Sequence, residues 1–374
     1  MRIPDSLLIN NFMYNLNKSK NNLSLIQTQL TTQSKVNKPS DNPLSNNKIL
    51  RLQNQLTSIY TYKENVSFAQ SILEDSISSM DSMSAEILNV QQQLTQLNSA
   101  IVGDDLNTFA QSIDASLEIL LELSNNEFNG QYSFGGSESN KQPFIYDKVN
   151  NIVTTNNNVG GDRLVRISPN IIQKINIHGK ELFQSVFTQS GNLDSTVAVG
   201  GVQTNSTSIY DAEGNEYTLN MAYTKTAANE YEMNYTIVDS DSNIIEDQTV
   251  TGLAFNSETG AFESMNGDSL GEIHVKNADN KIDFIIDLKT FKEKDSATNF
   301  VNKLNQKADI FNTLIAIRDK LLNGEKPTGD QVEIVNDFYQ HLLNNQSKAG
   351  GILKKLQSTE EILQNQELEV SELL

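Results

Sequence analysis

The chain has 374 residues, 37% of them hydrophobic, with a formal net charge of −19 and no cysteine. So acidic a chain offers no basic surface for nucleic acid or an anionic membrane, and without cysteine it has no disulfides, thiolate nucleophiles or thiolate metal sites. Its start lacks the features of a Sec signal, and no run of about 18 apolar residues could span a membrane.

The first predicted helix carries a narrow apolar stripe. Its apolar residues recur at intervals of three and four, which is typical of a coiled-coil helix. Such a helix is not stable alone, so it is either an ordinary bundle helix or one whose partner lies far away in sequence or in another subunit. The turn that follows and the distant C-terminal seam favour the second interpretation. We expect an assembly interface at Ile9, Phe12, Leu16, Leu23, Ile26 and Leu30.

A sharp turn separates this helix from a much longer one. Proline removes a backbone donor and pushes the residue before it out of the helical region. Asn42 before Pro43 is typical of an N-cap followed by proline at the first helical position. The next helix, from about 44 to 101, should be about 80 Å long, a rod element. The turn residues are Pro39, Ser40, Asp41, Asn42 and Pro43.

After a further helix over 106–125 the pattern changes. Alternating apolar residues separated by Asp-, Glu-, Gly- and Asn-rich turns predict an inserted all-β domain over 190–289. Helix should return at about Ser296, with Val301 and Leu304 on its seam. In the last helix, Gly350-Gly351 predicts either a bend or a close approach of another backbone. The rod core should include Leu73, Ile77, Phe311 and Leu342.

The fold class is therefore α+β and multidomain. Helices at both ends of the chain should form a long antiparallel bundle or coiled-coil rod, and the all-β domain should be inserted into it. The helices at the two ends of the chain carry matching heptad patterns, so they most simply pair side by side.

No pattern in the sequence indicates catalysis, a cofactor or a metal. The three histidines, His178, His274 and His341, stand in separate contexts without metal-ligand spacing, and the glycine pairs do not form a phosphate loop. Asp239 to Asn243 is similar to part of a calcium loop but lacks its glycine and terminal glutamate, so a hairpin turn is favoured. We expect no enzyme activity.

Several phrases of the sequence are distinctive in combination. They are Arg2–Pro4, 25–32, 36–43, 69–73, Asn129–Gly136 with Gln142–Phe144, Gly161-Asp162 and His178–Phe183. Together they resemble the flagellin-like family, and within it the hook–filament junction proteins, over about 1–190 and 295–370. Gln33 stands where that family has a helix-ending glycine, and Asn42 replaces an aspartate of its turn. The segments 206–226 and 253–260 carry a second resemblance, to an outer domain of the flagellar hook protein.

The resemblance implies a structural subunit of the bacterial flagellum that adapts the hook-side junction protein, hook-associated protein 1, to flagellin. It implies assembly with itself in a helical ring and binding of a flagellar export chaperone. It also implies type III export without a Sec signal to the extracellular hook–filament junction. Nucleic acid and membrane are not expected partners. Two alternatives stay open: a flagellin-type filament subunit, and a secreted enzyme or adhesin on the same scaffold.

The chain is thus divided into five expected segments. The family continues after the last one with an amphipathic helix that would pair with the first helix, so we expect the C-terminal segment to be truncated at Leu374. The segments are a polymerisation helix and turn (1–42), a helical rod with a β-hairpin region (43–189), the inserted all-β domain (190–289), returning rod helices (290–345) and the start of a coiled-coil helix (346–374).

Overall fold

The structure, a computed structural model, describes residues 5–33, 35–38, 40, 42–98, 106–155, 159–277 and 279–374. It confirms the α+β class, with long helices and a large β domain. Contacts divide the chain into two compact units. The first comprises residues 1–67, 166–171 and 357–374, and the second comprises 68–165 and 172–356.

The first unit consists of helical segments and the short segment Arg166–Ile171. It contains α1 (Asp5–Thr32), the beginning of α2 (Pro43–Asn98) and the end of α6 (Gly329–Leu373). Lys63 Nζ lies 2.6 Å from Glu367 Oε2 and joins the α2 and α6 segments of this unit. Leu363 is buried in the same unit, as an apolar seam between two helices requires.

The predicted turn is confirmed at its helix-starting end. Asn42 Oδ1 accepts a hydrogen bond of 3.1 Å from Ser45 N, and Pro43 is the first residue of α2. This is the expected N-cap, because the side-chain oxygen takes up a backbone donor that the helix leaves unpaired. Pro39 and Asp41 lie outside the described residues. Gln33, where the family has glycine, has the left-handed φ of 53° that glycine adopts at lower cost.

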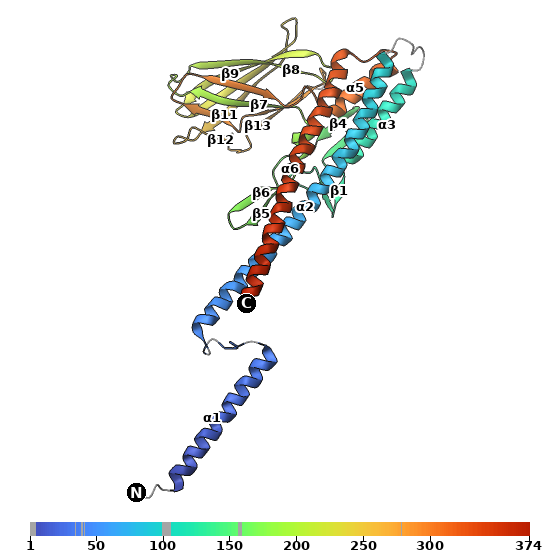
Figure 1. The fold of residues 1–374 in the computed structure, drawn as a ribbon. Coiled ribbons are helices and arrows are strands. Elements are labelled where there is room, and N and C mark those ends of the chain that lie inside the picture. Colours follow the sequence, from blue (N-terminus) through green and yellow to red (C-terminus); the bar gives the residue numbers. More distant parts are fainter. Residues whose placement is uncertain are drawn as a thin grey trace. The chain divides into compact units, whose positions relative to one another are not determined.

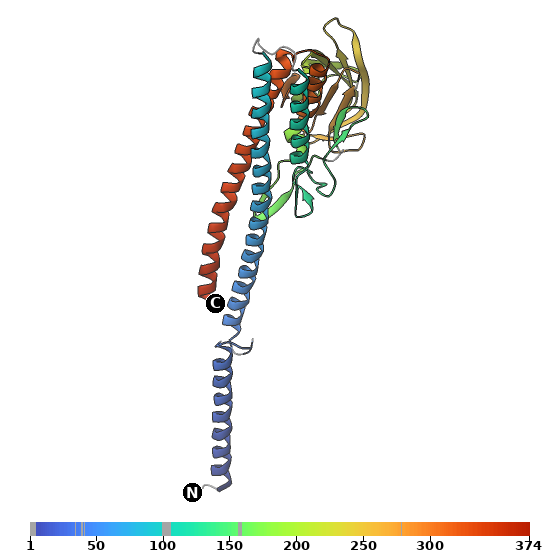
Figure 2. The same cartoon turned by 90° about the vertical axis from the view of Figure 1, so that its right-hand side faces the viewer.

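The second unit contains a bundle of helices. The rest of α2 and α6 run side by side in opposite directions here (Figures 1 and 2), and Gln346 Nε2 donates a 2.7 Å hydrogen bond to Asp81 Oδ1 between them. Two shorter helices, α3 (Leu106–Ser124) and α5 (Ile310–Leu322), pack against each other. Buried apolar side chains line these helices, including Leu73, Met80, Ile87, Leu117, Phe311, Leu314, Phe338 and Leu342.

Short hairpins and one short helix connect the bundle to the β domain. They are β1 (Glu127–Phe128) with β2 (Gln131–Tyr132), β3 (Phe144–Asp147) with β4 (Ile152–Thr155), β5 (Leu164–Ser168) with β6 (Ile171–Lys174), and α4 (Gly179–Phe183).

The β domain consists of two sheets around one apolar core (Figure 1). Consecutive antiparallel strands make the first sheet, in the order β12-β11-β10-β9-β8. They are β8 (Val202–Tyr210), β9 (Glu216–Ala227), β10 (Glu230–Val238), β11 (Ile244–Phe255) and β12 (Phe262–Met265). The turn over Asp239–Asn243 connects β10 and β11, as predicted: Asp239 Oδ1 accepts from the backbone of Asp241 and Asn243.

The second sheet has the order β13-β14-β7-β15, with β16 also paired to β7. Its strands are β7 (Val186–Asp194), β13 (Glu272–Asn277), β14 (Ile282–Asp287), β15 (Phe291–Lys294) and β16 (Asn299–Leu304). The facing side chains of both sheets fill the core, with Tyr223 and Phe291 in tilted contact at 5.4 Å between ring centroids.

The predicted start of the returning helix is wrong. Residues 299–304 form β16, which pairs antiparallel with β7, and α5 begins at Ile310. Phe300 and Leu304 pack against the β core whereas Val301 is half-exposed. Leu304, Ala308, Phe311 and Ile315 follow one another at steps of four, three and four, which suit a helix. This spacing concealed the strand that ends at Leu304. The β structure therefore extends over 186–304 rather than 190–289.

The glycine pair in α6 does not mark a close contact. The helix continues through Gly350 and Gly351, and a Cβ added at either would meet no described atom within 4 Å. Of the two predicted alternatives, a bend or a close approach of another backbone, the second is therefore wrong within the described residues.

Candidate assembly surface

Helix α1 exposes the residues predicted for assembly. Ile9, Phe12, Leu16, Leu23, Ile26 and Leu30 are between 51% and 74% exposed. Met13, Tyr14 and Leu25 are exposed as well. Apolar surface of this extent on one helix is typical of an interaction site. Among the described residues nothing buries this stripe, so α1 has the character of a helix that lacks a partner.

The polar side of α1 is partly satisfied within the helix. Thr28 Oγ1 donates to Ser24 O at 2.9 Å, and Thr31 and Thr32 donate to the carbonyls four residues earlier. These hydroxyls keep their lone pairs as acceptors. A neighbouring chain could therefore form hydrogen bonds here without desolvating a charge.

Three of the four predicted rod-core residues are fully buried. Leu73, Phe311 and Leu342 lie in the second unit with at most 1% of their surface exposed, and Ile77 is half-buried. Sequence phrases far apart in the chain meet beside Phe311, in a cluster of five phenylalanines that we call the aromatic node. It consists of Phe134, Phe144, Phe183, Phe311 and Phe338.

Close packing at the aromatic node explains one glycine. Gly179 N donates to Phe134 O at 2.8 Å. A Cβ on Gly179 would lie 2.8 Å from Phe144 Cζ and 2.9 Å from Phe134 O. Centroid distances of 4.9 Å for Phe144–Phe183 and 5.1 Å for Phe183–Phe311 are typical of favourable aromatic pairs. The node joins a hairpin, α4, α5 and α6.

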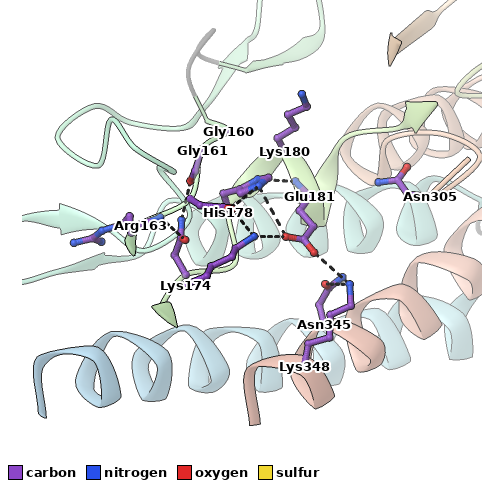
Figure 3. Close-up of polar contacts among 12 residues, drawn as sticks. Gly160, Gly161, Arg163, Lys174, His178, Lys180, Glu181, Asn305, Asn345 and Lys348 are labelled. Carbon is purple, nitrogen blue, oxygen red and sulfur yellow. Dashed lines mark hydrogen bonds and ion pairs between the residues drawn. The ribbon is translucent and has the colours of Figure 1, made fainter. Parts of the chain in front are cut away.

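A polar cluster lies beside the node, with Glu181 at its centre (Figure 3). Lys174 Nζ lies 3.1 Å from Glu181 Oε2, and Lys348 Nζ lies 3.2 Å from Glu181 Oε1. The Glu181 carbonyl contacts His341 Nε2 at 2.8 Å. Glu181 thus connects β6, α4 and α6. Burial alone would raise the pKa of the Glu181 carboxyl group. The positive charges of the neighbouring lysines outweigh this effect and hold the pKa below its usual value.

His178 is a structural residue of this cluster. Its Nδ1 accepts a 3.1 Å hydrogen bond from Glu181 N and so caps α4. Burial, with Lys174 close by, lowers the pKa of His178 to about 4, so the ring is neutral at pH 7. Within the ranges that the structure describes, no group of three or more His, Cys, Asp and Glu could hold a metal.

The β domain is fastened to the helical part of the second unit by ion pairs. Lys180 of α4 pairs with Glu272 of β13. Glu213, in the turn before β9, lies 2.6 Å from Lys281 Nζ and 3.6 Å from Lys320 Nζ of α5. Gly214 follows it with a left-handed φ of 87°, and a Cβ there would lie 2.4 Å from Asp330 Cβ. This turn therefore sits directly on the start of α6.

Sequence reasoning missed these polar contacts. The paired residues include Lys174, Glu181 and Lys348, and Lys348 is far from the other two in the chain. The spacing of charged residues in a sequence does not indicate which of them pair. The one sequence signal for this region was the phrase His178–Phe183, because it belongs to the residues that carry the family resemblance.

Comparison with known families agrees with this geometry. Residues 5–139, which include α1, α2, α3 and β1–β2, match the family described as bacterial flagellin N-terminal helical region. The N-terminal third of the chain is thus similar to flagellins. Residues 184–313 match the flagellar basal body protein FlaE D2 domain. A hook-type module therefore matches where the β domain lies, as the second resemblance predicted. A search of curated proteins gave no significant match.

Solved structures show the same fold. Flagellar hook-associated protein 3 from Legionella pneumophila is 16% identical, with a TM-score of 0.51, covering 87% of this chain and 97% of that one. A structure of the flagellar junction protein FlgL from the same organism is 16% identical, with a TM-score of 0.50, covering 89% and 100%. The chain has the fold of these two solved structures. No helix within the described residues is long and apolar enough to span a bilayer.

Proposed function

We propose that this flagellin-like protein is a structural subunit of the hook–filament junction rather than an enzyme. The supporting observation is the combination of a flagellin N-terminal region and a hook-type β module in one chain. A subunit that adapts one lattice to another needs surfaces compatible with both. The clusters beside the aromatic node are paired and serve packing, which leaves the exposed stripe of α1 as the functional surface.

The partners follow from this role. The stripe of α1 would pack into a helical ring of identical subunits, with hook-associated protein 1 on the hook side and flagellin on the filament side. A flagellar export chaperone would cover the exposed apolar residues before assembly, since free surface of this kind promotes aggregation. Export would use the flagellar type III apparatus.

Deletion of the gene tests the proposal against the filament-subunit alternative. Loss of a junction subunit should leave cells that secrete flagellin into the medium, because the filament has no base on which to grow. Loss of a filament subunit should instead leave hooks with their junction proteins and no secreted filament protein. The second outcome would refute the proposal. Immunogold labelling of a single narrow band between hook and filament should accompany the first.

A further inference from the structure

A small socket lies beside the β1–β2 hairpin and combines a cation with apolar side chains. Phe68 and Ile72 of α2 and Phe128 of β1 line it, together with Gln131 and Arg163, and we call it the arginine socket. Its volume of about 60 Å³ is far below the roughly 300–1,000 Å³ of sites for cofactors and drug-sized ligands. The socket therefore suits the end of one side chain rather than a whole small molecule.

Arg163 is the unbalanced charge of the arginine socket. Its backbone N–H donates to Asn176 Oδ1 at 2.8 Å, and its Nη2 donates to Gln131 Oε1. The second bond is the one hydrogen bond of the guanidinium among the described residues, although the group carries several N–H donors. Burial lowers the pKa of the guanidinium, and no neighbouring carboxylate opposes this effect. Figure 3 shows the side chain pointing away from the Glu181 cluster.

The composition of the chain makes this unpaired arginine notable. Acidic residues outnumber lysine and arginine by 47 to 28, yet no carboxylate of the described residues pairs with Arg163. Next to it Phe68 is 44% exposed. Arginine and aromatic side chains are enriched where protein–protein contacts are strongest. A partner for this socket should bring a carboxylate for Arg163 and an apolar group for Phe68.

One helix face of the second unit has the matching chemistry. Ile119 of α3 is 43% exposed, and exposed Glu118 and Glu122 lie beside it. Neither carboxylate has an ion pair or hydrogen bond within the described ranges. Residues four apart share one side of a helix, so these like charges repel each other until a cation approaches. The other exposed leucines in helices of this unit lack two unpaired carboxylates beside them: Leu88, Leu322 and Leu343.

We propose that the arginine socket receives a carboxylate of the Glu118–Glu122 pair from a second copy of this chain, with Ile119 covering Phe68. The contact rests on the self-assembly in the proposed function and names two surfaces that carry it. Copies with a net charge of −19 repel one another, so their association needs such a local attraction. Because the socket and the α3 face are different surfaces, the contact is heterologous and builds a ring or helix rather than a closed dimer.

Sedimentation velocity of the purified full chain over a concentration series, at constant ionic strength, tests the contact. Wild type should form species larger than a dimer. Arg163→Glu should associate at least about tenfold more weakly, because like charges then face each other. The double variant Glu118→Arg, Glu122→Arg should weaken association equally. A 1:1 mixture of the two variants should associate again, since each socket then meets a face of opposite charge.

Recovery on mixing separates a lost contact from a folding defect, because misfolded chains would not recover. Arg166→Glu, the same charge reversal at an exposed arginine outside the socket, should associate as wild type does. A wild type that stays monomeric, association that stops at the dimer, or a mixture that does not recover would each overturn the proposal. The measurement uses purified copies, so its result does not depend on where in the flagellum the chain lies. Failure of the gene-deletion test would therefore leave this contact standing, and loss of the contact would leave the deletion phenotype unexplained but unchanged.

Discussion

Aspartates in the stripe of α1 should block assembly without destabilising the free subunit. Phe12 and Leu16 are 65% and 52% exposed, so most of their apolar surface is already in contact with water. Full burial of such a side chain contributes about 1.5–3 kcal/mol, and each aspartate should therefore cost less than about 1.5 kcal/mol in the monomer. At an interface the same changes remove the full apolar contact and bury two charges.

The buried counterpart is Leu73→Asp. Leu73 is fully buried in the second unit, so this change loses the whole transfer free energy and places an unpaired carboxylate in the core, for a cost of at least about 4 kcal/mol. A loss of about 3 kcal/mol per subunit contact in the Phe12→Asp, Leu16→Asp double variant should raise the concentration needed for assembly more than about 100-fold.

Two measurements compare these variants. Differential scanning calorimetry follows the purified monomers, and swimming halos with electron microscopy of attached filaments follow a deletion strain that expresses each variant. We expect a near wild-type melting curve and no filaments for the double variant, and a strongly lowered melting temperature for Leu73→Asp. If the double variant melts as early as Leu73→Asp, α1 is an ordinary part of the core and the reasoning fails.

Three further predictions concern the fold. Gly350→Ala should raise stability by about 1 kcal/mol, because the helix interior there is open to a Cβ, whereas Gly179→Ala should lower it through the clash at the aromatic node; denaturant melts of both would decide. Excision of 186–304 with a short linker should keep the helical circular dichroism signal. Excision of 190–289 should instead leave β15 without its partner and β16 with only half of its pairing to β7, and should yield aggregates in size-exclusion chromatography. His178 is neutral in the fold, with its pKa lowered from 6.5 to about 4. The unfolded chain therefore binds the extra proton, and stability should fall by roughly 2–4 kcal/mol as the pH drops from about 6.5 to 4. His178→Asn keeps a capping oxygen and should flatten that acid limb.

The long helices could be predicted from spacing because each has one apolar face, which is largely buried in α2 and α6 and exposed in α1. Helix α2 shows this best: its apolar residues step by three and four from 49 to 94, and many of them, Leu73 and Leu94 included, are buried. Strands β9 and β10 were equally readable, since alternate residues such as Tyr223 and Met233 point into the core. Where one periodicity dominates, sequence predicts structure well.

The failures arose where local pattern and tertiary contacts disagree. Residues 299–304 fit a helical seam, but pairing with β7 and packing of Phe300 decide the conformation. The polar cluster at Glu181 could not be predicted, because only the folded chain brings Lys174, Glu181 and Lys348 together.

The pairing of β7 also sets an order of folding. Strands β8 to β12 are sequential neighbours and can form as soon as they exist, but β7 has β14, β15 and β16 as its partners, all beyond residue 281. Such non-local pairing is slow, because the loop between the strands must close first. A chain emerging from its N-terminus therefore holds β7 unpaired until the entire module is present. Refolding should show a fast phase for the meander and a slow one for the sheet around β7, and a chain cut short within this module would expose an unpaired strand to aggregation.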